Sequence, residues 1–377
     1  MLSFITVLSL FLFVLILPSS FWNLLQFIYV KVSGRAEENL NLERRKRLSV
    51  IVAIKGESPR MVKELLENMS KQTYKNFEVI IVSDDDERIF REVEKIAREF
   101  PFARLVKGKG KGLKAGALNL GSKLASGEFL VFLDVEARVE DDFLERASSL
   151  QGDAFAFRLK IRRNFSSALE DTYHAMTEFS MNALFRGRSS LGLPIFPNGS
   201  AFMIRKEVLS RVGGFKEGAY AEDLEIGIRL FIHGIKVNYN NDIPVYTIST
   251  PDERALRSQI SRWAYGSAEL LYESLSMIKK GLRGIEGFMY SQQWGLYFMP
   301  FIVLAIEIAL IPLLGPLPFL SSLAVFIVMS IPLILVNKSA KTSYGTYFLI
   351  AIMDGYLRGL LRIRYEWRVT PKEVIDR

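Results

Sequence analysis

The sequence predicts an α/β domain with a parallel sheet, lying between apolar segments long enough to cross a membrane. The first observation is the distribution of charge: residues 1–30 carry no charged side chain and residues 287–337 carry only Glu307, whereas 77 of the 256 residues from 31 to 286 are charged. The second is an alternation of apolar strands with amphipathic helices after residue 48. A charge-rich body between apolar blocks excludes a disordered chain, a fibrous repeat and a simple cytosolic enzyme.

The first apolar block, residues 1–30, predicts an N-terminal transmembrane helix. Its apolar run reaches Pro18 and resumes at Phe21, and a helix needs about 20 such residues to cross the hydrocarbon core. A signal peptide is the alternative, but no positive region precedes the run and no small-residue cleavage site follows. Residues 31–47 form a basic juxtamembrane linker. By the positive-inside rule the next domain is cytoplasmic, and the chain is an integral protein of the cell membrane.

The charged body begins with a regular alternation of elements. Apolar runs predict strands, and apolar residues at helical spacing predict the helices between them. The strands are expected at 49–55, 77–83, 103–106 and 128–134, and the helices at 60–70, 87–100 and 115–124. Such strands form a parallel sheet covered on both faces, and such sheets bind ligands at the carboxyl ends of their strands.

The second apolar block, residues 287–336, divides at Gly315–Pro318 and predicts two transmembrane helices, at about 295–314 and 318–336. Before it, residues 264–286 are expected to form one amphipathic helix at the membrane interface, with basic residues near its end. After it, residues 337–377 hold a third apolar run and a basic tail. A membrane span and a re-entrant or interfacial helix both stay open for this third run.

Composition limits the chemistry. The chain has no cysteine and two histidines, which excludes disulfides, thiolate nucleophiles, cysteine-based metal sites and multi-histidine sites. Any metal must be held by carboxylates, which suits Mg²⁺ or Mn²⁺. The net charge of +8, beside membrane segments, favours anionic lipid or phosphate. Nucleic acid is not expected as a partner, because no aromatic and basic stripe accompanies the charge.

Two acidic runs follow predicted strands. Asp84 and Asp85 begin the first run, which is either a polar helix start or a set of acceptors for the base or ribose of a nucleotide. Asp134 and Glu136 form the second. Two carboxylates at positions i and i+2 after a buried strand can jointly hold one divalent ion against phosphate oxygens.

A glycine- and lysine-rich segment, residues 108–114, follows the third strand. It lacks the ending of a Walker motif, and a solvated basic turn is the alternative to a phosphate-binding loop. Lys114 opens the next helix, so it is the lysine expected to point at a diphosphate.

Two further patterns lie on predicted helices. Glu222 and Asp223 stand at a helix start, where Asp223 is either an N-cap or an ionised general base. Gln259 and Arg262 share one face of a later helix. Arg262 can bind a diphosphate through its planar guanidinium, and Trp263 can stack on a sugar.

Taken in order, these motifs resemble the membrane-bound family 2 glycosyltransferases, which include cellulose, chitin and hyaluronan synthases and ceramide glucosyltransferase. Residues 48–265 carry the resemblance. Gln259, Arg262 and Trp263 match Q-x-x-R-W, Glu222–Asp223 match T-E-D, and Asp134 and Glu136 lie at D-x-D. Lys114–Asn119 resembles the K-A-x-A-L-N helix, and residues 197–200 and 212–215 resemble the G-x-G and V-G-G-F segments before the base.

The resemblance implies a GT-A fold, the Rossmann-like fold of nucleotide-diphospho-sugar transferases, for residues 48–263. It implies Mg²⁺ or Mn²⁺ at Asp134 and Glu136, and Asp223, beside Glu222, as the catalytic base of an inverting transfer. It implies a nucleotide-sugar donor, expected to be a UDP-sugar. The donor would be bound by Asp84 or Asp85, Lys114, Asp134, Gln259, Arg262 and Trp263. The sequence departs from the family in D-x-E for D-x-D, in A-E-D for T-E-D, and in Lys55-Gly56 after the first strand, which is closer to the ceramide glucosyltransferase group.

Three functions remain open on this basis. The favoured one is transfer of a single sugar to a lipid or lipid-linked acceptor among the membrane lipids, because processive synthases usually have more membrane helices. The second is a processive polysaccharide synthase with a glycan acceptor. The third is a non-catalytic membrane scaffold with a degenerate transferase domain.

Overall fold

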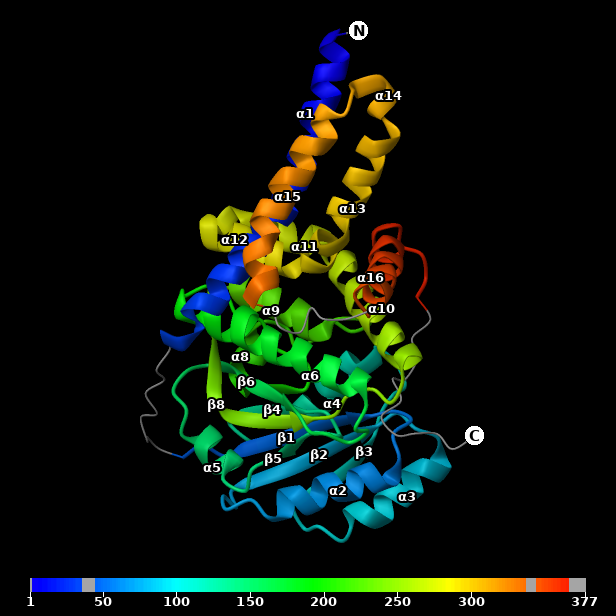
Figure 1. Ribbon diagram of the computed structural model, residues 1–377. Coiled ribbons are helices and arrows are strands. Elements are labelled where there is room, and N and C mark those ends of the chain that lie inside the picture. Colours follow the sequence, from blue (N-terminus) through cyan, green and yellow to red (C-terminus); the bar gives the residue numbers. More distant parts are fainter. Residues whose placement is uncertain (1, 36–44, 337–343, 366–377) are drawn as a thin grey trace. The chain divides into compact units, whose positions relative to one another are not determined.

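The computed structural model describes residues 2–35, 45–336 and 344–365, which divide into two compact units (Figure 1). Unit 1 comprises residues 1–35, 182–193 and 257–366, and unit 2 comprises residues 36–181, 194–256 and 367–377. Much of the predicted basic linker, at 36–44, and the tail from residue 366 onward lie outside the described residues.

Unit 2 is built on one eight-stranded sheet with the order β3-β2-β1-β4-β7-β6-β8-β5. The strands are β1 (Leu48–Ile54), β2 (Phe77–Ser83), β3 (Ala103–Lys107), β4 (Phe129–Leu133), β5 (Arg138–Val139), β6 (Ala154–Ile161), β7 (Ala201–Arg205) and β8 (Val237–Thr247). The four predicted strands, β1 to β4, are parallel, as expected. β7 is antiparallel to β4 and β6, and β5 to β8, so the whole sheet is mixed rather than parallel.

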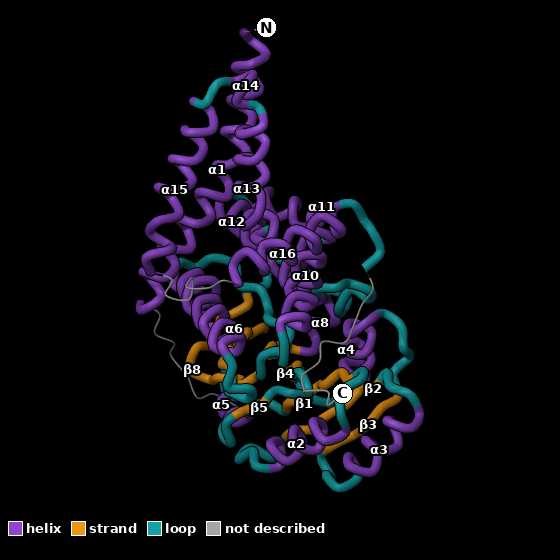
Figure 2. Tube along the Cα trace, turned by 45° about the vertical axis from the view of Figure 1, so that its right-hand side comes forward, coloured by secondary structure: helices purple, strands orange, loops and turns teal. Residues whose placement is uncertain are grey.

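Helices cover both faces of this sheet, as Figures 1 and 2 show. They are α2 (Pro59–Ser70), α3 (Glu87–Ala97), α4 (Leu113–Leu124), α5 (Phe143–Ser148), α6 (Ala168–Ser180), α8 (Lys206–Arg211) and α9 (Glu222–Ile232). The apolar sides of α2, α3 and α5 bury one face in a continuous core that includes Val50, Leu65 and Val79. On the other face α4 packs closely on β1 and β2, where a Cβ on Gly121 would come within 2.6 Å of Ile51. The predicted helices and strands up to residue 134 are confirmed.

The parallel half of the sheet determines where functional loops gather. β1, β2, β3 and β4 run in one direction, so their carboxyl ends meet at one edge. Residues 55–57, 84–86, 108–112 and 134–136 directly follow these strands. This is the edge at which parallel α/β sheets bind ligands.

Unit 1 consists of helices. They are α1 (Leu2–Val32), η1 (Ser33–Arg35), the π-helix η2 (Met181–Gly187), α7 (Arg188–Ser190), α10 (Glu253–Glu269), α11 (Leu271–Leu275), η3 (Ser276–Lys280), α12 (Leu282–Ser291), α13 (Gln293–Ala309), α14 (Ile311–Leu314), α15 (Leu317–Val336) and α16 (Tyr344–Leu360). The first residue of η2 and the first turn of α10 belong to unit 2. Within unit 1, α1 packs against α13 and α15 (Figure 1).

Two helices of unit 1 are long and apolar enough to cross a membrane, namely α1 from Phe4 to Val32 and α15. α12 and α13 meet the same test only as a pair that bends by 76°. The third apolar run forms α16, and its relation to the membrane stays a prediction. The single helix expected over 264–286 is instead divided among α10, α11, η3 and α12, because the chain breaks at Leu270 and at Gly281, whose φ of 73° suits glycine.

A buried ion pair joins distant parts of unit 1. The Arg188 guanidinium, with a fully buried side chain, donates hydrogen bonds of 2.7 and 2.9 Å to the two carboxylate oxygens of Glu286. The hydroxyl of Tyr29 donates to the same carboxylate at 3.0 Å. Bidentate pairs of this kind are directional, so they fix how α1, α7 and α12 meet.

Candidate active site

The acidic run after β2 holds three aspartates in different surroundings. Asp85 is 8% exposed, and its carboxylate accepts hydrogen bonds from the Gly56 N–H at 2.5 Å and the Ser83 hydroxyl at 2.9 Å. Asp84 is partly exposed and accepts the Gly110 N–H at 2.8 Å. Asp86 caps α3 by accepting the Ile89 N–H at 3.0 Å. Only Asp84 therefore ties this run to the glycine-rich loop.

The glycine-rich loop, residues 108–112, connects β3 to α4 and lies against the acidic run. A Cβ on Gly108 would come 2.0 Å from an Asp84 carboxylate oxygen, so this close approach requires glycine. Gly112 has a φ of 82° and stands at the N-cap of α4. The turn sets Lys114 in the first turn of the helix.

Lys114 is the centre of the site. Its Nζ donates to Asp134 Oδ1 at 2.7 Å and to the Gly199 carbonyl at 3.0 Å, and it lies 3.3 Å from Glu222 Oε1. Burial alone would lower the pKa of the Lys114 ammonium, but the carboxylates of Asp134, Glu222 and Asp223 together raise it above its usual range. The ammonium therefore stays charged.

Asp134 and Asp223 are held by one further segment, residues 199–200. The Ser200 hydroxyl donates to Asp134 Oδ2 at 2.5 Å, and the Gly199 N–H donates to Asp223 Oδ2 at 2.8 Å. Ala221 occupies the N-cap position of α9, so Asp223 is not the cap residue. Ser200 was not among the predicted site residues, although it closes a Pro-Asn-Gly-Ser segment just before a strand.

Side chains from two helices, α4 and α9, form hydrogen bonds with the backbone of the turn before α9. The Asn119 side chain of α4 donates to the Phe215 carbonyl and accepts the Phe215 N–H, both at 2.8 Å. Arg229 of α9 donates to the carbonyls of Val212 and Gly214 at 2.5 and 2.6 Å. These bonds fix the entry to α9 and hence the acids that begin it.

Carboxylates gather around the loop after β4. Glu136 is 5% exposed. Burial, together with the charges of Glu136 and Asp134, raises the pKa of the half-buried Glu57 to about 7, even though its hydrogen bond from the Lys55 N–H acts in the other direction. The sequence did not single out Glu57, since nothing local distinguishes it from a surface loop residue.

This carboxylate set fits a hard divalent cation that also binds phosphate oxygens. No group of three or more histidine, aspartate or glutamate side chains among residues 2–35, 45–336 and 344–365 is arranged to hold a metal by itself. Mg²⁺ bound together with substrate phosphates typically uses one or two carboxylates. Asp134 and Glu136 could supply two, and a cation would relieve the charge repulsion that, after burial, contributes to the raised pKa of Glu57.

The structure brings Lys114, Asp134, Glu222 and Asp223 together in unit 2. Gln259, Arg262 and Trp263 lie on α10 in unit 1. There Gln259 is 6% exposed, and the Trp263 ring stacks on Trp294 with centroids 6.1 Å apart. These three residues therefore belong to the helical unit, whereas Lys114, Asp134, Glu222 and Asp223, the Lys114 cluster, belong to unit 2.

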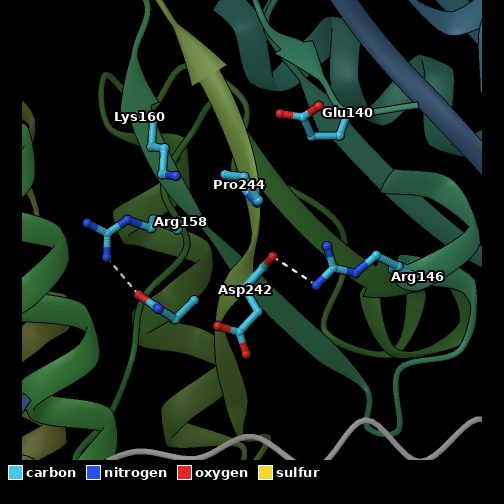
Figure 3. Close-up of a pocket in the computed structure, with 7 residues that line it drawn as sticks. Glu140, Arg146, Arg158, Lys160, Asp242 and Pro244 are labelled. Carbon is cyan, nitrogen blue, oxygen red and sulfur yellow. Dashed lines mark hydrogen bonds between the residues drawn. The ribbon is translucent and has the colours of Figure 1, made fainter. Parts of the chain in front are cut away.

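Unit 2 also has a polar pocket of about 490 Å³ that none of the predicted site residues lines. Its lining comes from α5, β6, β8 and the residue after β5: Glu140, Arg146, Arg158, Lys160, Asn241, Asp242 and Pro244. In Figure 3, Arg146 reaches the Asp242 carbonyl (2.9 Å) and Arg158 reaches the Asn241 side chain (2.8 Å) from the other side.

Comparisons with known proteins agree with this geometry. Residues 129–338 match the family model described as glycosyl transferase family group 2. A probable glycosyltransferase of Sulfolobus acidocaldarius is 29% identical over 96% of this chain and 88% of its own length. A beta-monoglucosyldiacylglycerol synthase of Nostoc sp. is 24% identical over 88% of this chain and 73% of its own length.

A solved structure has the same fold. The mannosyltransferase PcManGT from Pyrobaculum calidifontis, in complex with GDP-Man and Mn²⁺, superposes with a TM-score of 0.64 at 18% identity. The match covers 94% of this chain and 99% of that one. The mixed sheet is therefore of the GT-A type, as the resemblance implied.

Proposed function

Because the chain belongs to glycosyl transferase family group 2, we propose that it transfers a sugar from a nucleotide-diphosphate donor to a lipid acceptor at the cytoplasmic face of the cell membrane. The observation that carries the proposal is the Lys114 cluster. One ammonium joins Asp134 of the D-x-E motif and Glu222 of the A-E-D motif at the sheet edge where such folds bind ligands.

In this proposal Lys114 stabilises the leaving nucleoside diphosphate. Bond breaking at the anomeric carbon puts negative charge on the diphosphate, and a fixed cation in a water-poor site stabilises that charge most strongly. Asp134 and Glu222 hold the ammonium in position until donor binds.

Asp223 is the general base of this reaction. Its carboxylate lies in the first turn of α9, where the helix dipole favours the ionised form. The proton of the acceptor hydroxyl passes to Asp223 as the hydroxyl oxygen bonds to the anomeric carbon and the bond to the diphosphate breaks, with inversion.

Asp134 and Glu136 would hold Mg²⁺ or Mn²⁺, which would supply further positive charge to the diphosphate oxygens. Asp84 is assigned to the nucleoside, since it is partly exposed beside the glycine-rich loop, whereas Asp85 is buried and its carboxylate binds the Gly56 N–H after β1. The donor contacts of Gln259, Arg262 and Trp263 are proposed from the Q-x-x-R-W resemblance.

The apolar helices of unit 1 support a lipid acceptor and a membrane location. α12 bends by 76° from α13, and its Leu282 is 86% exposed next to the exposed Lys280 and Arg283. If α13 crosses the bilayer, α12 lies close to the membrane plane with apolar and basic groups at the lipid interface. A related protein named for glucosyldiacylglycerol synthesis also favours a lipid.

The test is a donor screen with purified protein in lipid nanodiscs. UDP-sugars and GDP-mannose are each supplied with Mg²⁺ or Mn²⁺ and extracted lipid, and nucleoside diphosphate release and product length are measured. Asp223→Asn should abolish lipid-linked product, whereas the exposed Asp242→Asn should not change it. Product at the normal rate with Asp223→Asn would refute the base assignment, and long chains would favour the polysaccharide synthase.

A further inference from the structure

Polar side chains of α2 and its C-terminal end form hydrogen bonds with the segment that follows β4. Glu64, Asn68 and Gln72 are spaced four residues apart, so they lie along one face of the helix and its C-terminal end. Each of them bonds to residues between 138 and 144. We call this set the α2 clamp.

The first part of the clamp fixes the backbone on both sides of Glu136. Arg138 Nη1 donates to the carbonyls of Val135 and Ala137, both at 2.8 Å. The Arg138 guanidinium is in turn held by Glu64 at 3.0 Å, and its side chain is only 11% exposed. Because the guanidinium is planar, the two carbonyls cannot turn independently of each other.

The rest of the clamp fixes the residues that follow. Asn68 donates to the Val139 carbonyl and accepts the Val139 N–H, both at 2.9 Å. Gln72 donates to the Glu140 carbonyl at 2.8 Å and accepts the Leu144 N–H at 2.9 Å. Side-chain amides thus supply the partners that a neighbouring strand would otherwise give to this backbone.

We propose that the α2 clamp is a positioning device that presets Glu136 for a divalent cation, with Arg138 as its principal positioning residue. The inference rests on the proposed function, in which Asp134 and Glu136 hold that cation. Groups that orient a metal ligand from outside the first coordination sphere typically change metal affinity by about 10- to 100-fold when mutated. A loop of the same sequence without the clamp would have to become ordered as the ion binds, which lowers affinity.

The experiment measures Mn²⁺ affinity directly, by electron paramagnetic resonance on the full-length protein in nanodiscs with UDP or GDP present. Arg138→Lys keeps the charge but loses the planar fork, and Glu64→Gln loses the ion pair that holds the fork. We expect the Mn²⁺ Kd to rise by about 10- to 100-fold for Arg138→Lys and by less for Glu64→Gln. Glu67→Gln is the matched control, because Glu67 is an exposed acid of the same helix, and its Kd should not change.

The outcomes separate the clamp from the proposed function. Unchanged Mn²⁺ affinity in both Arg138→Lys and Glu64→Gln, with a lower Tm, would mean that the contacts only stabilise the fold, and would overturn the clamp alone. Equal Mn²⁺ affinity in the wild type and Glu136→Gln would overturn the metal assignment and the clamp with it. If Arg138→Lys does not fold, Glu64→Gln decides the question.

Discussion

The acidic runs after β2 and after β4 are alike in sequence and in position, but they differ in their partners. Asp84 and Asp85 accept hydrogen bonds from the neutral groups of Gly110, Gly56 and Ser83. Asp134 faces the ammonium of Lys114. The carboxylates of the first run are therefore held mainly by backbone N–H groups. In the second run, Asp134 forms an ion pair with Lys114.

This difference supports the proposal that the second run takes part in the reaction. Neutral donors fix a carboxylate without adding a second charged group beside it. An ammonium shared among acids is sensitive to any new anion or cation nearby, because charge interactions in a partly buried site are strong. Four predictions test this comparison.

The largest effect is expected at Lys114. Lys114→Ala removes the fixed cation proposed to stabilise the leaving diphosphate, and kcat should fall by about 10²- to 10³-fold. Steady-state release of nucleoside diphosphate measures this. Lys111→Ala removes an exposed lysine of the same loop and should leave kcat nearly unchanged. Equal losses in the two variants would mean that only the overall charge of the loop matters.

The second prediction compares Asp85 with Asp84. Asp85→Ala leaves the buried Ser83 hydroxyl and the Gly56 N–H without their acceptor, so the free energy of unfolding should fall by about 1–3 kcal/mol. Asp84→Ala frees an exposed N–H of Gly110, so it should keep its stability but raise the KM for the donor. Thermal unfolding and donor titration on both variants distinguish them. Lower stability in Asp84→Ala and a higher donor KM in Asp85→Ala would show that the roles assigned to the two residues are reversed.

The third prediction concerns pH. The pKa of Glu57 is about 7 in the folded protein against an ordinary value of 4.5. Between these values the folded state keeps a proton that the unfolded chain has released, so stability falls as pH rises through this window. Unfolding scans from pH 4.5 to 8 without divalent ions should show this slope in the wild type. A slope of the same size in Glu57→Gln would contradict the assignment.

The smallest effect is expected at Asp86, which only caps α3. Asp86→Ala should lower the Tm less than Asp85→Ala does, because water can replace an exposed cap. Donor KM and kcat should not change. A clear rise in KM would show that the whole run, and not Asp84 alone, meets the donor.

The sequence was sufficient for the first half of the sheet. Apolar runs such as 77–83 coincide with the observed strand, since a strand buried on both faces needs apolar residues throughout. Helical spacing likewise located α2 and α3. Past residue 134 less of the fold can be predicted, because the antiparallel pairing of β7 with β4 depends on contacts between residues far apart in the chain.

The same reason limits what could be predicted of the site. Lys114, Asp134 and Asp223 could be picked out because each ends or begins an element. The choice between Asp84 and Asp85 depends on Gly110 and Gly56, which come from other loops. Glu57 and Arg138 carry no local pattern, and Ser200 does not stand out within the 197–200 segment. Only the folded chain brings these three residues to the carboxylates.

The ion pair of Arg188 with Glu286 has a consequence for the order of events during synthesis. Tyr29 bonds to a residue that the ribosome adds 257 positions later. At Leu256 all of unit 2 except residues 367–377 has been synthesised, before α12 and α13 exist. Since domains fold as they emerge, we expect most of unit 2 to be structured while α1 still awaits its partners, so that the helical unit closes around Arg188 only afterwards.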